Sequence, residues 1–157
     1  MPVLDLMDLP AALPPRTPVL GLDLGEKTIG VAVSDLSMTI ASPLVLIHKR
    51  KFSLEAADIF AIMAERGAGG IVIGLPVNMD GTEGVRCQSN RAFARNLLRL
   101  RDMPIAFWDE RWSTQAVERV LIGEADMTRA KRAQVVDRAA AGYILQGALD
   151  RLKDAAR

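Results

Sequence analysis

Four acidic residues, at three places in the sequence, lie within or at the end of apolar stretches, where a carboxylate is costly unless it has a partner. Asp23 stands between leucines, Asp109 and Glu110 end an apolar run, and Asp137 lies among valines and alanines. Carboxylate oxygens are the ligands that Mg²⁺ and Mn²⁺ prefer in proteins, and such sites suit the cleavage of phosphodiester bonds. Together, these acids indicate a site for a hard cation.

Three of these acids also have a purely structural interpretation, which the sequence leaves open. The alternatives are a turn cap for Asp23, an ion pair with Arg111 for Asp109, and an ion pair with Arg132 or Arg138 for Asp137.

Other kinds of catalytic site find little support in the sequence. The single histidine, His48, lies in a basic turn, so a Ser-His-Asp triad or a histidine general base is not expected. The single cysteine, Cys87, has no further histidine besides His48 that could act as its base, and it is expected to pack on a helix. The glycine-rich segment 21–28 lacks the spacing of a phosphate-binding loop or a dinucleotide fingerprint.

Basic residues form three groups although the net charge is only +1. Segment 86–101 holds five arginines and no acid, and Arg91, Arg95 and Arg99 recur every four residues, so a helix would carry them as one stripe. The other groups are 48–51 and 129–132. Each group is compatible with a solvated face, but three groups in a near-neutral chain favour a polyanionic partner.

Length and composition restrict the protein class. The chain has 157 residues, 50% hydrophobic and 25% charged, as in one globular domain. No apolar run is long enough to cross a membrane, and an N-terminus with acids and prolines does not resemble a signal peptide. A single cysteine fits a reducing compartment, and seven aromatic residues are too few for modules that stack several bases. We expect a cytoplasmic protein.

Hydrophobic periodicity predicts an α/β domain over residues 17–157, after a flexible N-terminal extension of residues 1–16. Strands are expected over 17–24, 28–34, 41–47, 70–75 and 105–110. Helices are expected over 53–66, 85–101, 113–123 and 128–153, with Ser53 and Gly67 bounding the first. The short links between the early strands predict an antiparallel meander, and the later helices predict crossovers to parallel strands. The fold class is therefore a five-stranded mixed sheet with helices on both faces.

Four motifs in this order resemble the YqgF family of pre-16S rRNA nucleases, which are also described as Holliday-junction-resolvase-like. The resemblance covers about residues 18–150 and is carried by segments 21–35 (GLDLGEKTIGVAVSD), 73–83 (IGLPVNMDGTE), 109–114 (DERWST) and 137–145 (DRAAAGYIL).

The resemblance implies a ribonuclease H-like fold and a metal-dependent nuclease that trims the 5′ end of pre-16S rRNA. Asp23 and Asp137 match the family's acids on the first strand and the C-terminal helix. The wider ribonuclease H-like pattern has an acid at the end of the fourth strand, where this chain has Gly74. Asp109 or Glu110 would have to replace it, and we favour Glu110 for its longer reach.

In this interpretation Asp23, Glu110 (or Asp109) and Asp137 hold Mg²⁺ or Mn²⁺ and form the catalytic centre. Other residues would contact the nucleic acid, which is expected to be structured pre-rRNA in the small ribosomal subunit. These are Lys27, Asn78, Arg91, Arg95, Arg99, Arg111, Ser113 and Thr114. Two alternatives remain open: a resolvase for DNA junctions, and an rRNA-binding assembly factor without catalytic activity.

Overall fold

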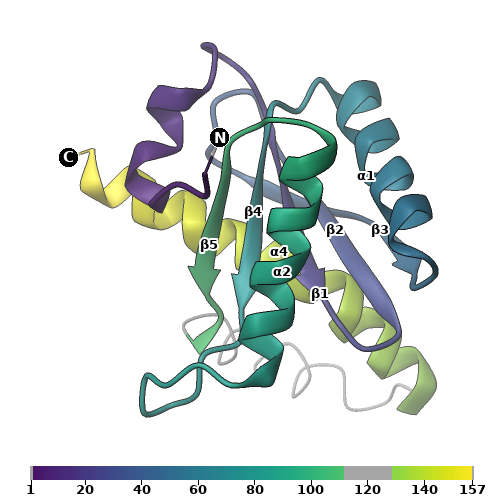
Figure 1. The fold of residues 1–157 in the computed structure, drawn as a ribbon. Coiled ribbons are helices and arrows are strands. Elements are labelled where there is room, and N and C mark those ends of the chain that lie inside the picture. The colour runs from purple at the N-terminus through teal and green to yellow at the C-terminus, as the bar shows by residue number, and fades with distance from the viewer. Residues whose placement is uncertain (1, 112–128, 157) are drawn as a thin grey trace.

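The computed structural model describes residues 2–111 and 129–156, with the side chains of 129–138 left out (Figure 1). Five strands form one sheet in the order β3-β2-β1-β4-β5. Their bounds are β1 Val19–Leu24, β2 Thr28–Ser34, β3 Ala41–His48, β4 Gly70–Leu75 and β5 Ile105–Asp109. The first three strands pair antiparallel, whereas β1–β4 and β4–β5 pair parallel. The predicted meander followed by parallel strands is confirmed.

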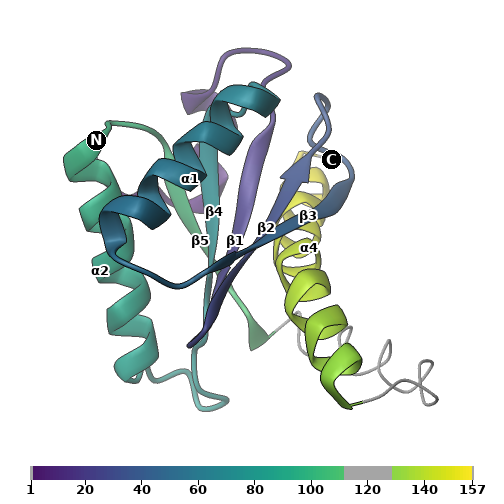
Figure 2. The same ribbon diagram turned by 90° about the vertical axis from the view of Figure 1, so that its right-hand side faces the viewer.

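Helices cover both faces of the sheet, as the sequence predicts. Helices α1 (Phe52–Arg66) and α2 (Val85–Leu100) lie on one face, and α4 (Arg129–Ala155) crosses the other (Figure 2). The helix expected over 113–123 lies outside the described residues. Within the part of the chain that is described, no helix combines the length and apolar character needed to span a bilayer.

Alternating side chains of the strands divide the core into two layers. One layer packs against α1 and α2 and includes Leu22, Ile73 and Ile105. The other packs against α4 and includes Val72 and Ala106. Central strand β4 is buried at all six positions, which explains its unbroken apolar sequence.

Of the two residues expected to bound the first helix, Gly67 does so and Ser53 does not. Pro43 lies on β3, which is an edge strand, and Gly67 ends α1 with a φ of 68°. Ser53, however, does not cap α1, because the helix begins one residue earlier and Lys51 occupies the N-cap position. The buried carboxylate of Glu55 instead accepts a hydrogen bond from the backbone N–H of Arg50, at 2.8 Å, and so fixes the entry into the helix.

The N-terminal segment differs from the flexible extension expected from the sequence. The backbone N–H of Leu4 donates to the carbonyl of Ile105 at 2.8 Å, so the segment pairs with the outer edge of β5. Two short 3₁₀ turns follow, Leu6–Asp8 and Pro10–Ala12, and between them Leu9 is fully buried against the layer under α4. Burial of Leu6 and Leu9 offsets the conformational entropy that the segment loses when it is ordered.

Candidate metal and nucleic-acid site

Asp23 and Glu110 lie on the same face of the sheet, at the ends where β1 and β5 finish. A Cβ built on Gly21 would lie 2.7 Å from the Cβ of Leu145 on α4, so this side of β1 faces α4. Asp23 follows two residues later and therefore faces the same way. Glu110 stands two residues beyond Trp108, which is paired with Gly74 in the β4–β5 register.

Gly74 leaves the space through which Glu110 reaches Asp23. The parallel register places Leu22 beside Ile73, so Asp23 lies next to Gly74, and Gly74 next to Trp108. A Cβ on Gly74 would lie 3.0 Å from both Cγ and Cδ of Glu110 and 2.6 Å from Cδ1 of Ile144. The sequence has Gly74 where related folds have an acid. Because Gly74 has no side chain, the glutamate that follows β5 can cross over β4 at this position.

The electrostatics of Glu110 follow from this position. Burial, the negative charge of Asp23 and a hydrogen bond with Asp23 raise the pKa of Glu110 from its ordinary value of 4.5 to about 7, against the opposing effect of Arg86. Two carboxyl groups held together in a partly buried place repel each other when both are ionised. A divalent cation bound to both would relieve this repulsion, so the donor pair fits Mg²⁺ or Mn²⁺.

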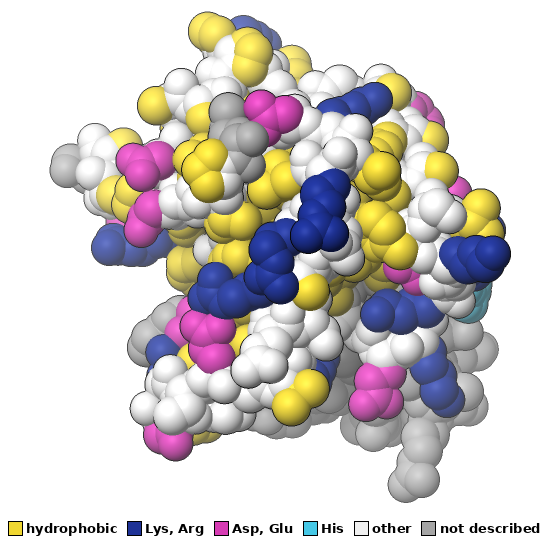
Figure 3. Space-filling model, viewed as in Figure 1, with side chains coloured by type: hydrophobic (Ala, Val, Ile, Leu, Met, Phe, Trp, Pro, Cys, Tyr) yellow, Lys and Arg dark blue, Asp and Glu magenta, His cyan; other side chains and the backbone are white. Residues whose placement is uncertain are grey.

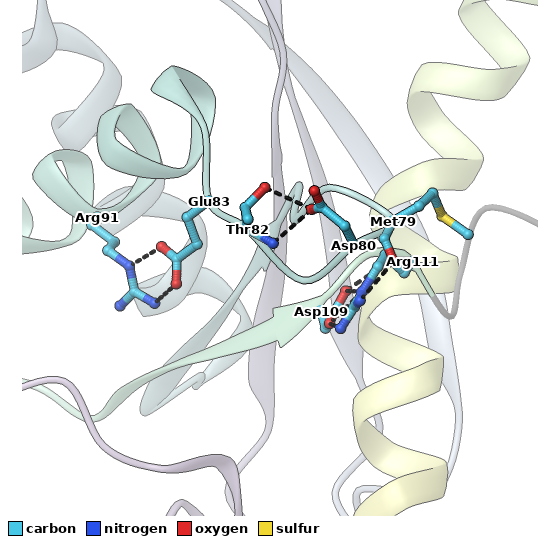
Figure 4. Close-up of polar contacts among 7 residues, drawn as sticks. All are labelled: Met79, Asp80, Thr82, Glu83, Arg91, Asp109 and Arg111. Atoms are coloured by element: carbon cyan, nitrogen blue, oxygen red, sulfur yellow. Dashed lines mark hydrogen bonds and ion pairs between the residues drawn. The ribbon is translucent and has the colours of Figure 1, made fainter.

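Asp109, the other candidate on this strand, is turned to Arg111. The Arg111 guanidinium donates to Asp109 at 2.6 Å (Nη2 to Oδ2) and 2.9 Å (Nε to Oδ2), and the backbone N–H of Arg111 donates to Oδ1 at 3.0 Å. Nη1 of Arg111 also donates to the carbonyl of Met79 at 3.4 Å (Figure 4). The ion pair that the sequence left open as an alternative for Asp109 is present.

Segment 76–84 is closed by hydrogen bonds between its own residues. The backbone N–H of Asn78 donates to the carbonyl of Thr82 at 2.9 Å, and Asn78 Nδ2 donates to Thr82 Oγ1 at 3.0 Å. Asp80 accepts from both the N–H and the hydroxyl of Thr82, which lowers the pKa of its carboxyl. Gly81 has a φ of 90°, which favours glycine. Asn78 and Met79 are exposed on this turn.

The arginine stripe is only partly free for a ligand. Arg91 donates to both carboxylate oxygens of Glu83, at 2.7 and 2.8 Å, and its Cζ lies 5.0 Å from the centre of the Phe107 ring. This ion pair was not predicted, because Glu83 lies before the acid-free segment 86–101. Arg95 and Arg99 are exposed on the same helix, and Figure 3 shows a band of Lys and Arg side chains across this face.

The remaining candidates have less structural context. Lys27 is exposed in the turn between β1 and β2. Asp137 lies within α4, one turn before Ala141. The carbonyl oxygen of Ala141 would lie 3.2 Å from a Cβ on Gly21, so this part of α4 is close to β1. The side chain of Asp137 lies outside the described part of the structure. Ser113 and Thr114 also lie outside the described residues. Among the described residues, no three His, Cys, Asp or Glu side chains form a metal-binding cluster. Cys87 is buried, and burial raises the pKa of its thiol. Both features agree with the expected role in packing, because a reactive cysteine has a lowered pKa.

Residues 17–151 match the family model described as "RuvX: Holliday junction resolvase". A protein of Phenylobacterium zucineum named "Putative pre-16S rRNA nuclease" is 72% identical over 155 residues, which cover 98% of this chain and 99% of that protein. A protein of Caulobacter vibrioides with the same name is 66% identical over 154 residues, covering 98% and 99%.

A solved structure has the same fold at low identity. The T. thermophilus RuvC in complex with a Holliday junction substrate aligns with a TM-score of 0.54 and 12% identity, covering 87% of this chain and 96% of that one. This likeness and the strand order confirm the ribonuclease H-like fold. With the family match over most of its length and these close relatives, the chain belongs to the RuvX family, the one that its YqgF-like motifs predict.

Proposed function

We propose that this protein is a metal-dependent nuclease that hydrolyses a phosphodiester bond of pre-16S rRNA at its 5′ end. The observation that carries the proposal is the approach of Glu110 across Gly74 to Asp23. The names of the relatives support the substrate, and processing of rRNA would place the protein in the cytoplasm.

Asp23 and Glu110 are the proposed ligands of Mg²⁺ or Mn²⁺, with Asp137 as the third. A bound ion of this kind lowers the pKa of a coordinated water and neutralises charge on a phosphate. The two described carboxylates would hold that ion at the sheet edge. Asp109 is better explained as a positioning residue, because its carboxylate holds Arg111, and Arg111 holds the carbonyl of Met79.

Exposed residues around the centre are proposed to bind the nucleic-acid strand. Lys27 lies in the turn after β1, Asn78 lies in the turn after β4, and the arginine stripe extends along α2. Ser113 and Thr114, which follow Arg111 in the sequence, are proposed to contribute as well.

The experiment compares wild type with Asp23→Asn on a panel of substrates in Mg²⁺ and in Mn²⁺. The panel holds a precursor 16S fragment, the same fragment already trimmed, and a four-way DNA junction, which tests the activity in the family description. We expect the wild type to cut the precursor, and Asp23→Asn, which is nearly isosteric, to keep its fold and lose cleavage.

Three other outcomes would overturn parts of this proposal. Preferential cutting of the junction would replace the RNA substrate with DNA. Equal cleavage by Asp23→Asn would remove the catalytic assignment. Binding of the precursor without any cleavage by the wild type would favour an assembly factor.

A further inference from the structure

Arg86 differs from the other arginines near the carboxyl pair. Arg91 is engaged by Glu83, and Arg111 by Asp109. Arg86 is exposed in the first turn of α2, and among the described residues no ion pair takes up its charge. The sequence showed it only as one member of an arginine-rich segment.

Arg86 lines the same cavity as Glu110. This hollow has a volume of about 260 Å³ and is lined by Pro76, Val77, Met79, Arg86, Glu110 and Arg111. Its walls are an apolar turn, two guanidinium groups and one carboxyl group.

The guanidinium of Arg86 and the proposed metal ligand Glu110 thus line the same cavity. Because Arg111 already makes a two-pronged contact with Asp109, Arg86 is the guanidinium on this wall whose donors are available to a ligand. A guanidinium presents donors in a planar fork that matches two phosphate oxygens. The cavity is much larger than the ~30 Å³ that one water occupies in the liquid, so it has room for a bulkier group.

We propose that Arg86 binds the non-bridging oxygens of the scissile phosphate, with the Asp23–Glu110 pair on the other side of that group. In hydrolysis, the oxygen of a water forms a bond to phosphorus, the ester P–O bond breaks, and one proton of the water is released while the leaving oxygen gains one. Negative charge accumulates on the phosphoryl oxygens as this occurs, so a fixed guanidinium stabilises the transition state more than the ground state. The proposal rests on the proposed nuclease function and adds a catalytic residue to it.

The test uses Arg86→Gln and Arg86→Lys in the full chain, with Arg66→Gln as the control. Arg66 is an exposed arginine in the last turn of α1, so the control removes the same charge from a helix surface. Steady-state cleavage of the precursor fragment gives kcat and KM. A second readout, the dissociation constant for the same RNA, is measured in an Asp23→Asn background, where no cleavage is expected.

We expect Arg86→Gln to lower kcat by about 100-fold or more, with KM and the dissociation constant changed by less than about threefold. Arg86→Lys recovers part of kcat because it keeps the charge but not the fork, and Arg66→Gln matches the wild type. Unchanged kcat in Arg86→Gln, or a rise in KM alone, overturns the role of Arg86 and leaves the nuclease function intact. A wild type that cleaves nothing overturns both.

Discussion

At the scale of single residues, the site depends on a glycine that leaves room for a glutamate. Gly74 is a glycine between the branched residues Ile73 and Leu75 of β4, and the side chain of Glu110 occupies the space beside it. The result is a carboxyl pair that is unfavourable when both members are charged. Two predictions concern this pair.

The first prediction concerns pH and stability without metal. The folded chain keeps a proton on Glu110 up to a pKa of about 7, whereas the unfolded chain releases it near 4.5. Stability therefore falls as pH rises from about 4.5 to 7, and the loss is complete above 7. The upper bound is about 3 kcal/mol, since one pKa unit corresponds to about 1.4 kcal/mol.

Glu110→Gln removes this titration, so in EDTA it should be about 1 to 3 kcal/mol more stable than wild type at pH 8 and similar to it at pH 5. Urea denaturation at both pH values checks this. Mg²⁺ should then stabilise the wild type but not the variant. Equal stability of the two proteins at both pH values would show that the carboxyl pair carries no strain.

The second prediction concerns Gly74→Ala. The added methyl group meets Ile144 at 2.6 Å and Glu110 at 3.0 Å, so we expect a loss of about 1 to 3 kcal/mol in unfolding free energy together with a large loss of cleavage. Gly74→Ala/Ile144→Val removes the methyl group of Ile144 that makes the closer contact. It should regain stability but not cleavage. Recovery of both would mean that the position of Glu110 does not matter.

At the scale of elements, helix α2 and the N-terminal segment have roles that the sequence only partly indicates. Arg91 ties α2 to Glu83 and stacks on Phe107, so it contributes to structure as well as to charge. Arg95 and Arg99 are the members of the stripe that point a positive charge into solvent.

The third prediction follows for binding of precursor RNA. Arg95→Gln/Arg99→Gln should flatten the slope of log affinity against log salt by about one to two units, because each lost phosphate contact contributes roughly 0.7 to 0.9. The control Arg66→Gln/Arg151→Gln removes the same charge from exposed positions on α1 and α4. Identical slopes for the two double variants would mean that the stripe is a solvated face.

The fourth prediction tests the packing of the N-terminal segment. Leu9 is fully buried, so Leu9→Ala should lower the free energy of unfolding by about 2 to 5 kcal/mol. Met7→Ala is the control, because Met7 is 39% exposed and its truncation should change stability by less than about 0.5 kcal/mol. If Leu9→Ala is as stable as Met7→Ala, the segment is the loose extension that the sequence favours.

At the scale of the whole molecule, the strands and the directions in which they pair were predictable, and the contacts that refine the site were not. Periodicity located all five strands. The choice of Glu110 as the partner of Asp23 came with the resemblance to the YqgF family, and Asp109 was left open as the alternative. The role of Gly74 depends on the register between β4 and β5, which no local pattern encodes. A glycine within a strand of branched residues was the available signal.

Other features were hidden for similar reasons. The partner of Arg91 comes from a turn before its helix, so it escapes a search for acids within the helix. The N-terminal segment forms 3₁₀ turns too short to give a hydrophobic period, and its prolines indicated a loose chain. In both cases tertiary contacts decide what the local sequence leaves open.

The measurement that tests the central claim most directly compares Glu110→Gln with Asp109→Asn in cleavage of the precursor fragment at saturating Mg²⁺. The carboxyl pair consists of Asp23 and Glu110, whereas the carboxylate of Asp109 is held by the guanidinium of Arg111. We expect Glu110→Gln to lose about 100-fold or more in kcat, and Asp109→Asn to lose less than about tenfold, mainly through KM. Wild-type kcat in Glu110→Gln beside an inactive Asp109→Asn would contradict the account.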